Sequence, residues 1–336
     1  MMKRRFFKPL LIGLCLVFLS AISFTAYLGR QLASPERREL QDYHQQWIQQ
    51  QAQHSIHIQD GLLVNEQIPY LLVTPSTNAP LSERARIIRE QVQQHEITLP
   101  AIGEVTGTVV LLHGRNGRKE DLLPVAERFC ALGLRCLIPD LPAHGESPVE
   151  TVQFGLAELE QDLPRELLIE CAKHHQFNPE PSALWGISMG GCFATRSAAN
   201  NKQPQWQSLV IVSSFDRLDT VIKHQSHSSI LNDWVSYFSE LSNGADPAKV
   251  TPAVWAQSVS IPVLVAHGSD DALIPMSSGR KLYDSFPSND KKWIEVPGGD
   301  HDNVLITPMP LYAEMGVWIL KHLSPPQQEP EASSAP

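Results

Sequence analysis

Six short and nearly continuous apolar segments between residues 105 and 299 constrain the fold of this chain more than any other feature. In order they are TVVLLHG, RCLIPD, SALWG, SLVIVSS, IPVLVAHG and WIEVPGG. Strands buried on both faces of a parallel sheet have this composition, whereas half-exposed strands alternate between apolar and polar residues. Helical patterns separate most of the segments, over residues 122–132, 156–174, 192–199 and 281–286, and a last one lies near residues 310–323. The alternation predicts βαβ units and an α/β fold with a mostly parallel central sheet and helices on both faces.

Length and composition agree with such a fold. A chain of 336 residues, 42% hydrophobic and 19% charged, can bury the core of one large α/β domain or of two small ones. Two opening strands are predicted in HSIHIQDG and IPYLLVTP, followed by an amphipathic helix marked by Leu81, Ala85, Ile88 and Val92. The net charge of −9, with no basic stripe beyond the N-terminus, argues against a nucleic-acid partner.

The N-terminus has the composition of a membrane segment. Residues 1–8 carry four basic side chains, and residues 9–28 form a charge-free stretch of about 20 residues, the length that crosses a bilayer core. The basic residues are expected to hold residues 1–8 in the cytoplasm, so that the remainder is exported to the periplasmic or extracellular side. A cleaved signal peptide is the alternative, with small residues at Ala21-Ile22-Ser23. The stretch exceeds the usual signal core of about 7–15 residues, which favours a retained anchor.

The rest of the chain divides by composition. Residues 29–53 are polar and glutamine-rich and are interpreted as a stalk, residues 54–323 as the α/β domain, and residues 324–336 as a disordered tail. Residues 214–259 are longer than a plain crossover and are interpreted as a short helical cap. Its apolar face either roofs an acyl or aryl pocket or packs on the sheet. That face consists of Ile230, Leu231, Trp234, Val235, Phe238 and Leu241.

The cysteines do not indicate a metal or redox site. None of the five lies in a Cys-x-x-Cys pair. An exported domain permits disulfides, but Cys130, Cys171 and Cys192 lie within apolar helical patterns, where a buried free thiol is the more common outcome. The pairing of these residues and of Cys136 stays open.

The stretch WGISMGG places Ser188 between a buried apolar segment and a helical pattern. Ligands of doubly wound sheets bind beyond the carboxyl ends of the strands, which is where Ser188 is expected to lie. A serine on a sharp strand-to-helix turn needs small neighbours, and Gly186 and Gly190 occupy the positions of the nucleophile-elbow pattern. The pattern predicts that Ser188 is a nucleophile, and a purely structural glycine turn is the alternative.

A serine hydroxyl needs a base to accept its proton and an acid to orient that base. His301 is the predicted base, because it lies in a Gly-Gly-Asp-His-Asp turn between the last strand and the last helix. His113 and His267 are predicted to be structural histidines at strand ends. His224 and His227 have the spacing of metal ligands, but without a nearby carboxylate ligand they are interpreted as surface residues, and no metal site is predicted.

Residues 54–323 resemble the α/β-hydrolase family, particularly its esterase, lipase and serine-peptidase-like members. The resemblance rests on the motifs LHGR, PDLPAHGES, GISMGG, HGSDDALIP and GGDHD. It implies the chain order serine, acid, histidine. The family pattern places the acid three residues after the glycine of HGSDDALIP and four before its proline, which selects Asp271 and leaves Asp270 to cap the turn.

The resemblance also implies an oxyanion site formed by the backbone N–H groups of Arg115 and Met189. Asp140 is expected to be structural and to bind loop amides, in a loop where Ala143 stands in place of a glycine frequent in the family. The basic residues beside the oxyanion loop leave two interpretations, a preference for an anionic substrate or a solvated charged loop. They are Arg115, Arg118 and Lys119.

Together these features predict a serine hydrolase in which Ser188 attacks an ester, thioester or amide carbonyl and His301 acts first as base and then as acid. Asp271 holds the imidazole tautomer, and water releases the acyl group without a metal or organic cofactor. A carboxylesterase or lipase that acts on a small or lipid-like acyl substrate is favoured, with short or medium acyl esters preferred over peptides. An acyltransferase or a serine peptidase with the same three residues is the alternative. A non-catalytic binding protein of this fold is disfavoured, because it does not need all three residues in order.

Overall fold

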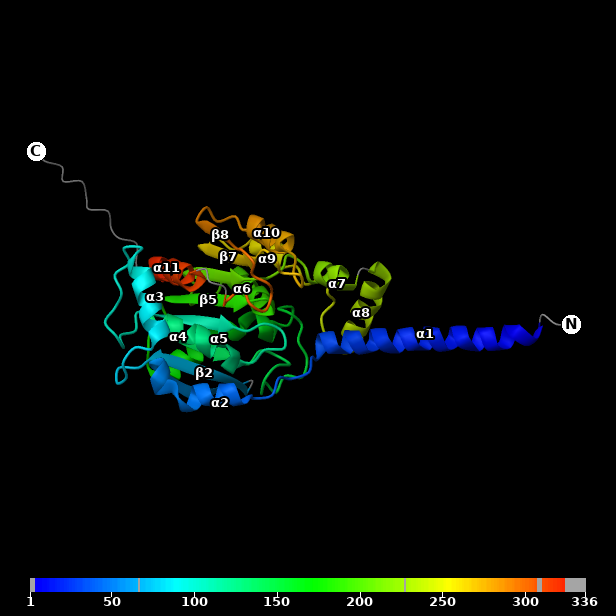
Figure 1. Cartoon of the computed structure of the whole chain (residues 1–336), viewed down its shortest axis with the longest axis horizontal. Helices are drawn as coiled ribbons and strands as arrows, with labels where there is room; N and C mark the ends of the chain where they lie inside the picture. Colours follow the sequence, from blue (N-terminus) through cyan, green and yellow to red (C-terminus); the bar gives the residue numbers. More distant parts are fainter. Residues whose placement is uncertain (1–3, 66, 227, 307–309, 324–336) are drawn as a thin grey trace, which may run out of the picture.

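The centre of the molecule is an eight-stranded mixed sheet between two layers of helices (Figure 1). This computed structural model describes residues 4–65, 67–226, 228–306 and 310–323. The strand order is β1-β2-β4-β3-β5-β6-β7-β8; β2 is antiparallel to both of its neighbours, and all strands from β4 to β8 run parallel. The predicted α/β fold, with a mostly parallel sheet and helices on both faces, is confirmed.

The predicted strands are all present. Strands β3, β6 and β7 are buried along their whole length, as continuous apolar segments predict. The edge strand β8 is buried at only two of its positions. The strands are β1 (Ile56–Leu63), β2 (Ile68–Pro75), β3 (Gly107–Leu112), β4 (Leu134–Pro139), β5 (Ser182–Ile187), β6 (Ser208–Val212), β7 (Val263–Gly268) and β8 (Lys291–Val296).

An apolar core lies on each face of the sheet. One core takes residues from three helices, α3 (Glu83–Gln93), α4 (Leu123–Ala131) and α11 (Leu311–Leu323). The other takes residues from α5 (Glu158–His175), α6 (Met189–Ala199), α9 (Pro252–Ala256) and α10 (Met276–Ser285). Two short 3-10 turns are η1 (Gln51–His54) and η2 (Lys119–Leu122). The four domain cysteines are buried free thiols.

A long N-terminal helix, α1 (Arg4–Ala33), projects from one end of the domain (Figure 1). Its segment Leu11–Ala33 has 23 residues and a mean hydropathy of 2.2, long and apolar enough to cross a membrane. A signal sequence meets the same two criteria. The last turn of α1 is part of the domain, because the Val152 N–H donates to the Ala33 carbonyl at 2.8 Å. The cap helices α7 (Leu218–Ser226) and α8 (Ser229–Leu241) lie at this same end.

The segment predicted as a stalk lies against the domain. Its helix α2 (Asp42–Gln49) buries His44, whose Nε2 lies 2.8 Å from Asp121 Oδ1. Upstream, the Arg37 guanidinium donates to backbone carbonyls of the loop at residues 145–149. The helical spacing of Tyr43 and Trp47 therefore reflects packing on the domain, and residues 34–54 are not a free spacer.

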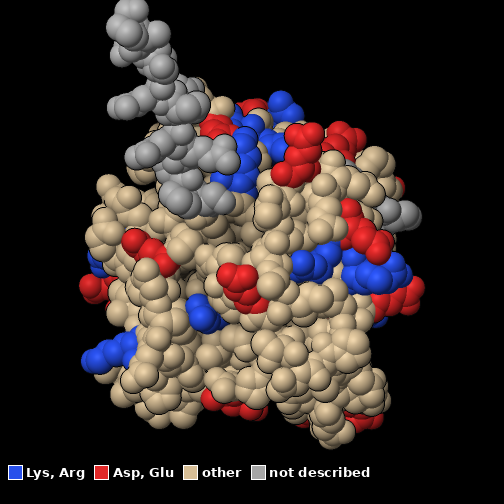
Figure 2. All heavy atoms as spheres, turned by 90° about the vertical axis from the view of Figure 1, so that its left-hand side faces the viewer, with Lys and Arg blue, Asp and Glu red and all other residues tan. Residues whose placement is uncertain are grey.

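The surface of the domain remote from α1 is mixed in charge. Figure 2 shows lysine and arginine side chains interspersed with aspartate and glutamate among neutral residues on this face. Such a surface is typical of protein in contact with water.

Candidate active site

Ser188 occupies a sharp turn between β5 and α6. Its backbone has φ 54° and ψ −120°, a conformation that is strained for a residue with a side chain and that recurs at functional sites. A Cβ at Gly190 would lie 2.0 Å from the carbonyl oxygen of Leu112, and one at Gly186 would lie 2.2 Å from the carbonyl oxygen of Gly190. Both predicted elbow glycines are therefore needed for close backbone approach.

The strand β6 and the segment that follows it form hydrogen bonds with the backbone of this turn. The Ser188 N–H donates to the Val212 carbonyl at 2.9 Å. The Ser214 hydroxyl, a group to which the sequence assigned no role, donates to the Ser188 carbonyl at 2.8 Å. These bonds fix the backbone of the turn, so that its hydroxyl is presented above the sheet.

His301 is presented by a tight loop after β8. The Asp300 carboxylate accepts the N–H groups of Asp302 (2.9 Å) and Asn303 (2.7 Å), an Asx-type turn in which the side chain replaces a backbone acceptor. The preceding Gly299 packs so closely on Gly268 at the end of β7 that a Cβ at Gly268 would lie 2.2 Å from the Gly299 carbonyl oxygen. This contact brings the loops after β7 and β8 together.

The structure brings Ser188, Asp271 and His301 together at the carboxyl end of the sheet. His301 Nε2 lies 3.0 Å from Ser188 Oγ, and His301 Nδ1 lies 2.8 Å from Asp271 Oδ2. Both distances are within hydrogen-bonding range. Such an arrangement can move a proton from a hydroxyl to an imidazole whose other nitrogen faces a carboxylate.

Asp271 has a well-defined environment. Its Oδ1 accepts the N–H groups of Leu273 (3.1 Å) and Ile274 (2.8 Å), which leaves Oδ2 for His301. Burial alone would raise the pKa of this carboxyl, but the bonds from His301 and Ile274 and the nearby imidazoles outweigh burial and lower the pKa. Asp270, predicted to cap this turn, instead accepts the Ser269 hydroxyl (2.7 Å). The turn amides are bound by Asp271 itself.

Two other histidines singled out in the sequence are held by backbone groups, and His267 Nε2 also lies 3.6 Å from Asp271 Oδ2. His113 Nε2 accepts the Leu141 N–H at 3.0 Å, and His267 Nε2 lies 2.9 Å from the Ile274 carbonyl. Both are buried, and burial lowers the pKa of both imidazoles. They are structural, as predicted. His224 is exposed, and His227 lies outside the described residues. Within the described ranges no group of three or more His, Cys, Asp or Glu is placed to hold a metal.

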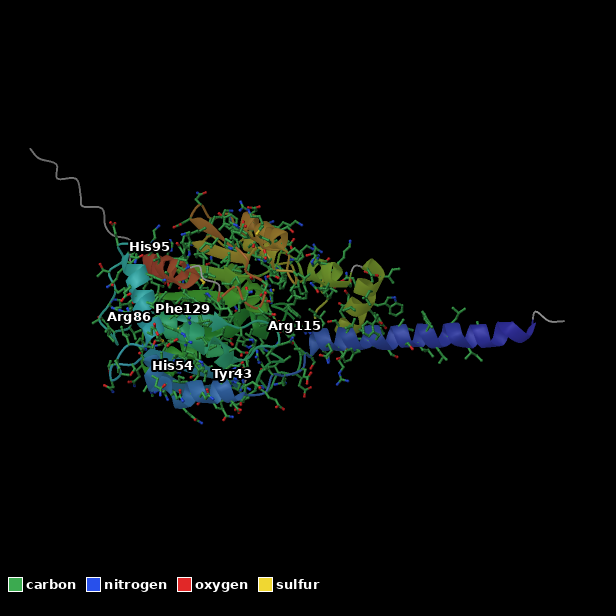
Figure 3. All side chains as sticks on the ribbon, in the orientation of Figure 1. Tyr43, His54, Arg86, His95, Arg115 and Phe129 are labelled. Atoms are coloured by element: carbon green, nitrogen blue, oxygen red, sulfur yellow. The ribbon has the colours of Figure 1, made fainter. Side chains whose placement is uncertain are left out.

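The predicted oxyanion residues flank Ser188. A Cβ at Gly114 would lie 3.4 Å from the Cβ of Ser188, so the loop containing Arg115 runs beside the hydroxyl. Met189 is the first residue of α6, where backbone N–H groups lack an intrahelical acceptor. The Arg115 guanidinium donates to the Gln31 carbonyl of α1 at 2.5 Å. Figure 3 shows Arg115 at the end of the domain from which α1 projects.

Neither interpretation of the basic loop residues holds for Arg118 and Lys119. Both side chains are buried, because the turn η2 directs them inward against carboxylates. Lys119 Nζ lies 3.0 Å from Asp140 Oδ2 and 2.7 Å from Glu146 Oε2. Burial would lower the pKa of Lys119, but these carboxylates outweigh burial and raise it.

Asp140 also accepts the N–H groups of residues 119 and 146, which is the structural role predicted for it. Ala143 in the same loop has φ +64°, the left-handed conformation that favours glycine.

A cavity of about 580 Å³ opens beside Ser188 and is lined mainly by apolar side chains. Of the predicted cap face, Leu231 and Val235 line this cavity, which supports the roof interpretation, whereas Ile230, Trp234 and Leu241 are exposed. Sequence analysis did not anticipate the lining residues that come from α1, because apolar residues at the end of a membrane-length segment carry no signal that separates lipid contact from pocket lining. These α1 residues are Phe24, Leu28, Gln31 and Leu32.

A second unanticipated group, the buried carboxyl of Glu160, supports the pocket. It accepts the N–H groups of Gln153 (2.6 Å) and Gly155 (2.7 Å), on either side of the pocket residue Phe154. Burial raises the pKa of Glu160 to about 7, against the opposing effect of these amides. Its role is to fix a wall of the cavity.

Comparisons with known proteins agree with this architecture. Residues 103–251 match the family model described as serine aminopeptidase, S33. The uncharacterised protein YfhR of Salmonella typhi is 27% identical over 209 residues, which cover 58% of this chain and 64% of that protein. A monoacylglycerol lipase of Mycolicibacterium smegmatis is 26% identical over 258 residues, covering 65% of this chain and 89% of the lipase. An esterase of Pyrococcus furiosus has the same fold, with a TM-score of 0.63 and 16% identity over 87% of this chain and 99% of the esterase.

The fold and these matches agree with one another. The chain has the α/β-hydrolase fold, and the matched segment and the relatives support a serine-hydrolase-type protein of the α/β-hydrolase family. The alignment spans less than two thirds of the length of YfhR, the first of the relatives described above.

Proposed function

We propose that this protein is a serine hydrolase that cleaves a carboxylic ester with an apolar acyl group through an acyl-enzyme on Ser188. The observation that carries the proposal is the position of His301, with Nε2 at 3.0 Å from Ser188 Oγ and Nδ1 at 2.8 Å from Asp271 Oδ2. A binding protein has no need of this geometry, whereas nucleophilic catalysis by a serine requires it.

The proposed reaction has two halves. Ser188 Oγ attacks the ester carbonyl carbon while His301 Nε2 accepts its proton, and the N–H groups of Arg115 and Met189 bind the oxyanion that forms. The bond to the leaving alcohol then breaks, and His301 donates the proton to that alcohol. In the second half water attacks the acyl-Ser188, with His301 again as base, and the carboxylic acid is released. Throughout, ionised Asp271 stabilises the imidazolium.

The cavity favours an ester over a peptide. Its lining is mainly apolar, and its volume of about 580 Å³ suits one drug-sized ligand or one acyl chain. A peptide backbone would leave polar groups without partners on such walls. The names of two relatives, a monoacylglycerol lipase and an esterase, point in the same direction.

The proposal predicts covalent labelling of Ser188 by a fluorophosphonate, which reacts with activated serine hydroxyls. Mass spectrometry of the wild-type protein is expected to locate the adduct on Ser188, and Ser188→Ala is expected to lose it. Ser285→Ala, at a partly exposed serine of α10, serves as the matched control and should be labelled like the wild type. A wild-type protein that is folded and remains unlabelled would refute the proposed function.

We further propose that α1 is retained as a membrane anchor, with the catalytic domain on the periplasmic or extracellular side. The basic residues that precede the apolar segment support this orientation. Alkaline carbonate extraction of membranes is expected to leave the full-length protein in the pellet, and protease added outside intact spheroplasts is expected to degrade the domain. Complete release of a shortened protein that begins near Phe24 would instead indicate cleavage after Ser23.

A further inference from the structure

The last third of α1 is a wall of the cavity that contains Ser188. Phe24, Leu28 and Leu32 line this cavity, and their spacing of four residues places them on one face of the helix. Leu28 also packs against the main apolar core of the domain. At the edge of this face, Tyr27 does not line the cavity and is 58% exposed. A helix that served only as an anchor would not need a face shaped to the active site.

This wall is held in place at several points. The Arg115 guanidinium, from the loop proposed to bind the oxyanion, donates to the Gln31 carbonyl at 2.5 Å. At Gly29 the helix crosses α8 so closely that a Cβ would lie 2.5 Å from the Cβ of Phe238. Together with the Val152–Ala33 backbone bond, these contacts make the end of α1 a fixed part of the pocket.

The helix α8 forms another wall of the cavity. Its residues Leu231 and Val235 face the cavity, as described above. A different stripe of the same helix is apolar and exposed, at 71% for Ile230 and 68% for Leu241. Trp234 and Tyr237 lie in the same stripe and are also exposed.

This exposed stripe has the composition of a membrane-surface helix. Tryptophan and tyrosine concentrate at the boundary between lipid and water, and apolar faces of interfacial helices lie in that boundary. The helix α8 that carries the stripe packs on α1, which is itself long and apolar enough to cross a membrane. The opposite end of the domain instead carries mixed charges (Figure 2). The occupant that fits the stripe is therefore the lipid surface around α1.

From these contacts we infer that α1 is both anchor and substrate-binding wall. A single-chain acyl ester enters from the membrane surface beside Phe24, on the N-terminal side of the α1–α8 crossing, and its chain lies along Phe24, Leu28 and Leu32 with its carbonyl at Ser188. The substrate is inferred to carry a single acyl chain because the cavity has the volume of one drug-sized ligand. The inference rests on the proposed function, since it names the substrate class of the same site.

The test uses the full-length protein in vesicles of neutral phospholipid and a series of p-nitrophenyl esters from butyrate to palmitate. Leu28→Trp narrows the chain-binding wall and is expected to lower the ratio of kcat/KM for laurate over butyrate by about tenfold or more. Leu28→Ala widens the wall and should raise the relative rate for the longest chains. Tyr27→Trp is the matched control, because it introduces the same indole ring one residue away, at a side chain that does not line the cavity, and its ratio should equal that of the wild type.

Access from the membrane is tested with Ile230→Asp, which places a charge on the exposed stripe of α8. Its hydrolysis of a monoacyl ester embedded in the vesicles is expected to fall about tenfold relative to hydrolysis of soluble butyrate ester in the same sample. An unchanged ratio would overturn access from the membrane.

Fluorophosphonate labelling separates the possible failures. If Leu28→Trp is labelled at the wild-type rate and keeps the wild-type chain-length profile, the inference about α1 is wrong and the proposed hydrolase stands. If the wild type is not labelled, both proposals fail. Should Leu28→Trp not fold, Phe24→Trp replaces it, since Phe24 is largely exposed and tolerates a larger ring, and the same shift in profile is required.

Discussion

Asp271→Asn is expected to lower kcat for ester hydrolysis by about 10⁴-fold, whereas Asp270→Asn should leave kcat within about twofold of the wild type. The two residues are adjacent, and the sequence offers both as candidate acids. Only the carboxylate of Asp271 lies within 2.8 Å of His301 Nδ1. The pair of variants therefore isolates the role of one carboxylate in a nearly unchanged segment.

The expected loss follows from the hydrogen-bond roles of an amide. Oδ1 of Asp271 accepts two backbone N–H groups, and the asparagine oxygen is expected to keep those bonds. The amide NH₂ then faces His301 Nδ1 and donates to it, so the ring proton must reside on Nε2. That nitrogen faces Ser188 Oγ and can no longer accept its proton. The alternative amide orientation restores the tautomer but leaves the two backbone N–H groups facing a donor.

The measurement is kcat for p-nitrophenyl butyrate in detergent-solubilised full-length protein, with thermal unfolding as a check on folding. A folded Asp271→Asn variant within about tenfold of wild-type kcat, well short of the expected loss, would exclude Asp271 as the orienting acid. Loss of activity in Asp270→Asn alone would transfer that role to the neighbouring residue.

Much of the fold was predictable because the strands of a parallel sheet are covered on both faces. Their sequences are therefore continuous apolar segments, and β3 and β7 were located from composition alone. The same topology brings the carboxyl ends of parallel strands to one edge. For that reason the residues that follow β5, β7 and β8 were expected to meet, and the structure places Ser188, Asp271 and His301 within hydrogen-bonding distance there.

The charged loop after β3 could not be predicted in this way. Whether Lys119 is solvated or buried depends on three carboxylates that converge on it, and two of them, Asp140 and Glu146, come from the segment after β4. Sequence shows the charges but not this convergence. A buried cation is tolerated only with such partners, so its burial is a property of the folded loop pair.

The N-terminal segment shows a second limit of prediction from sequence. A run of apolar residues has the same composition whether its side chains face lipid or a pocket. The mean hydropathy of Leu11–Ala33 describes the whole segment, so it does not show that Leu28 lines the cavity and Tyr27 does not. The division arises only when the end of α1 packs on α8 and on the loop after β3. The polar segment that follows was likewise interpreted as a stalk because glutamine-rich composition does not reveal the buried contact of His44 with Asp121.

Alanine at position 190 is expected to destabilise the fold by at least about 4 kcal/mol, a shift in Tm of about 8–16 °C for a domain of this size. The added Cβ would lie 2.0 Å from the carbonyl oxygen of Leu112 and 2.7 Å from that of His113. These are backbone atoms at the end of β3, so no side chain can move aside to relieve the overlap. Either α6 or the end of β3 must shift, and both carry groups of the active site.

Gly298→Ala is the control for this experiment. Gly298 has φ +70° and no heavy atom within 4 Å of an added Cβ, so alanine there meets only the conformational cost of a left-handed residue, about 1–2 kcal/mol. Thermal unfolding followed by circular dichroism, with fluorophosphonate labelling as the readout of the site, should rank Gly190→Ala well below Gly298→Ala in both stability and labelling. Equal stability of the two variants would mean that the elbow can open without loss. In that case the close contact between α6 and β3 would not be what holds Ser188 in its strained conformation.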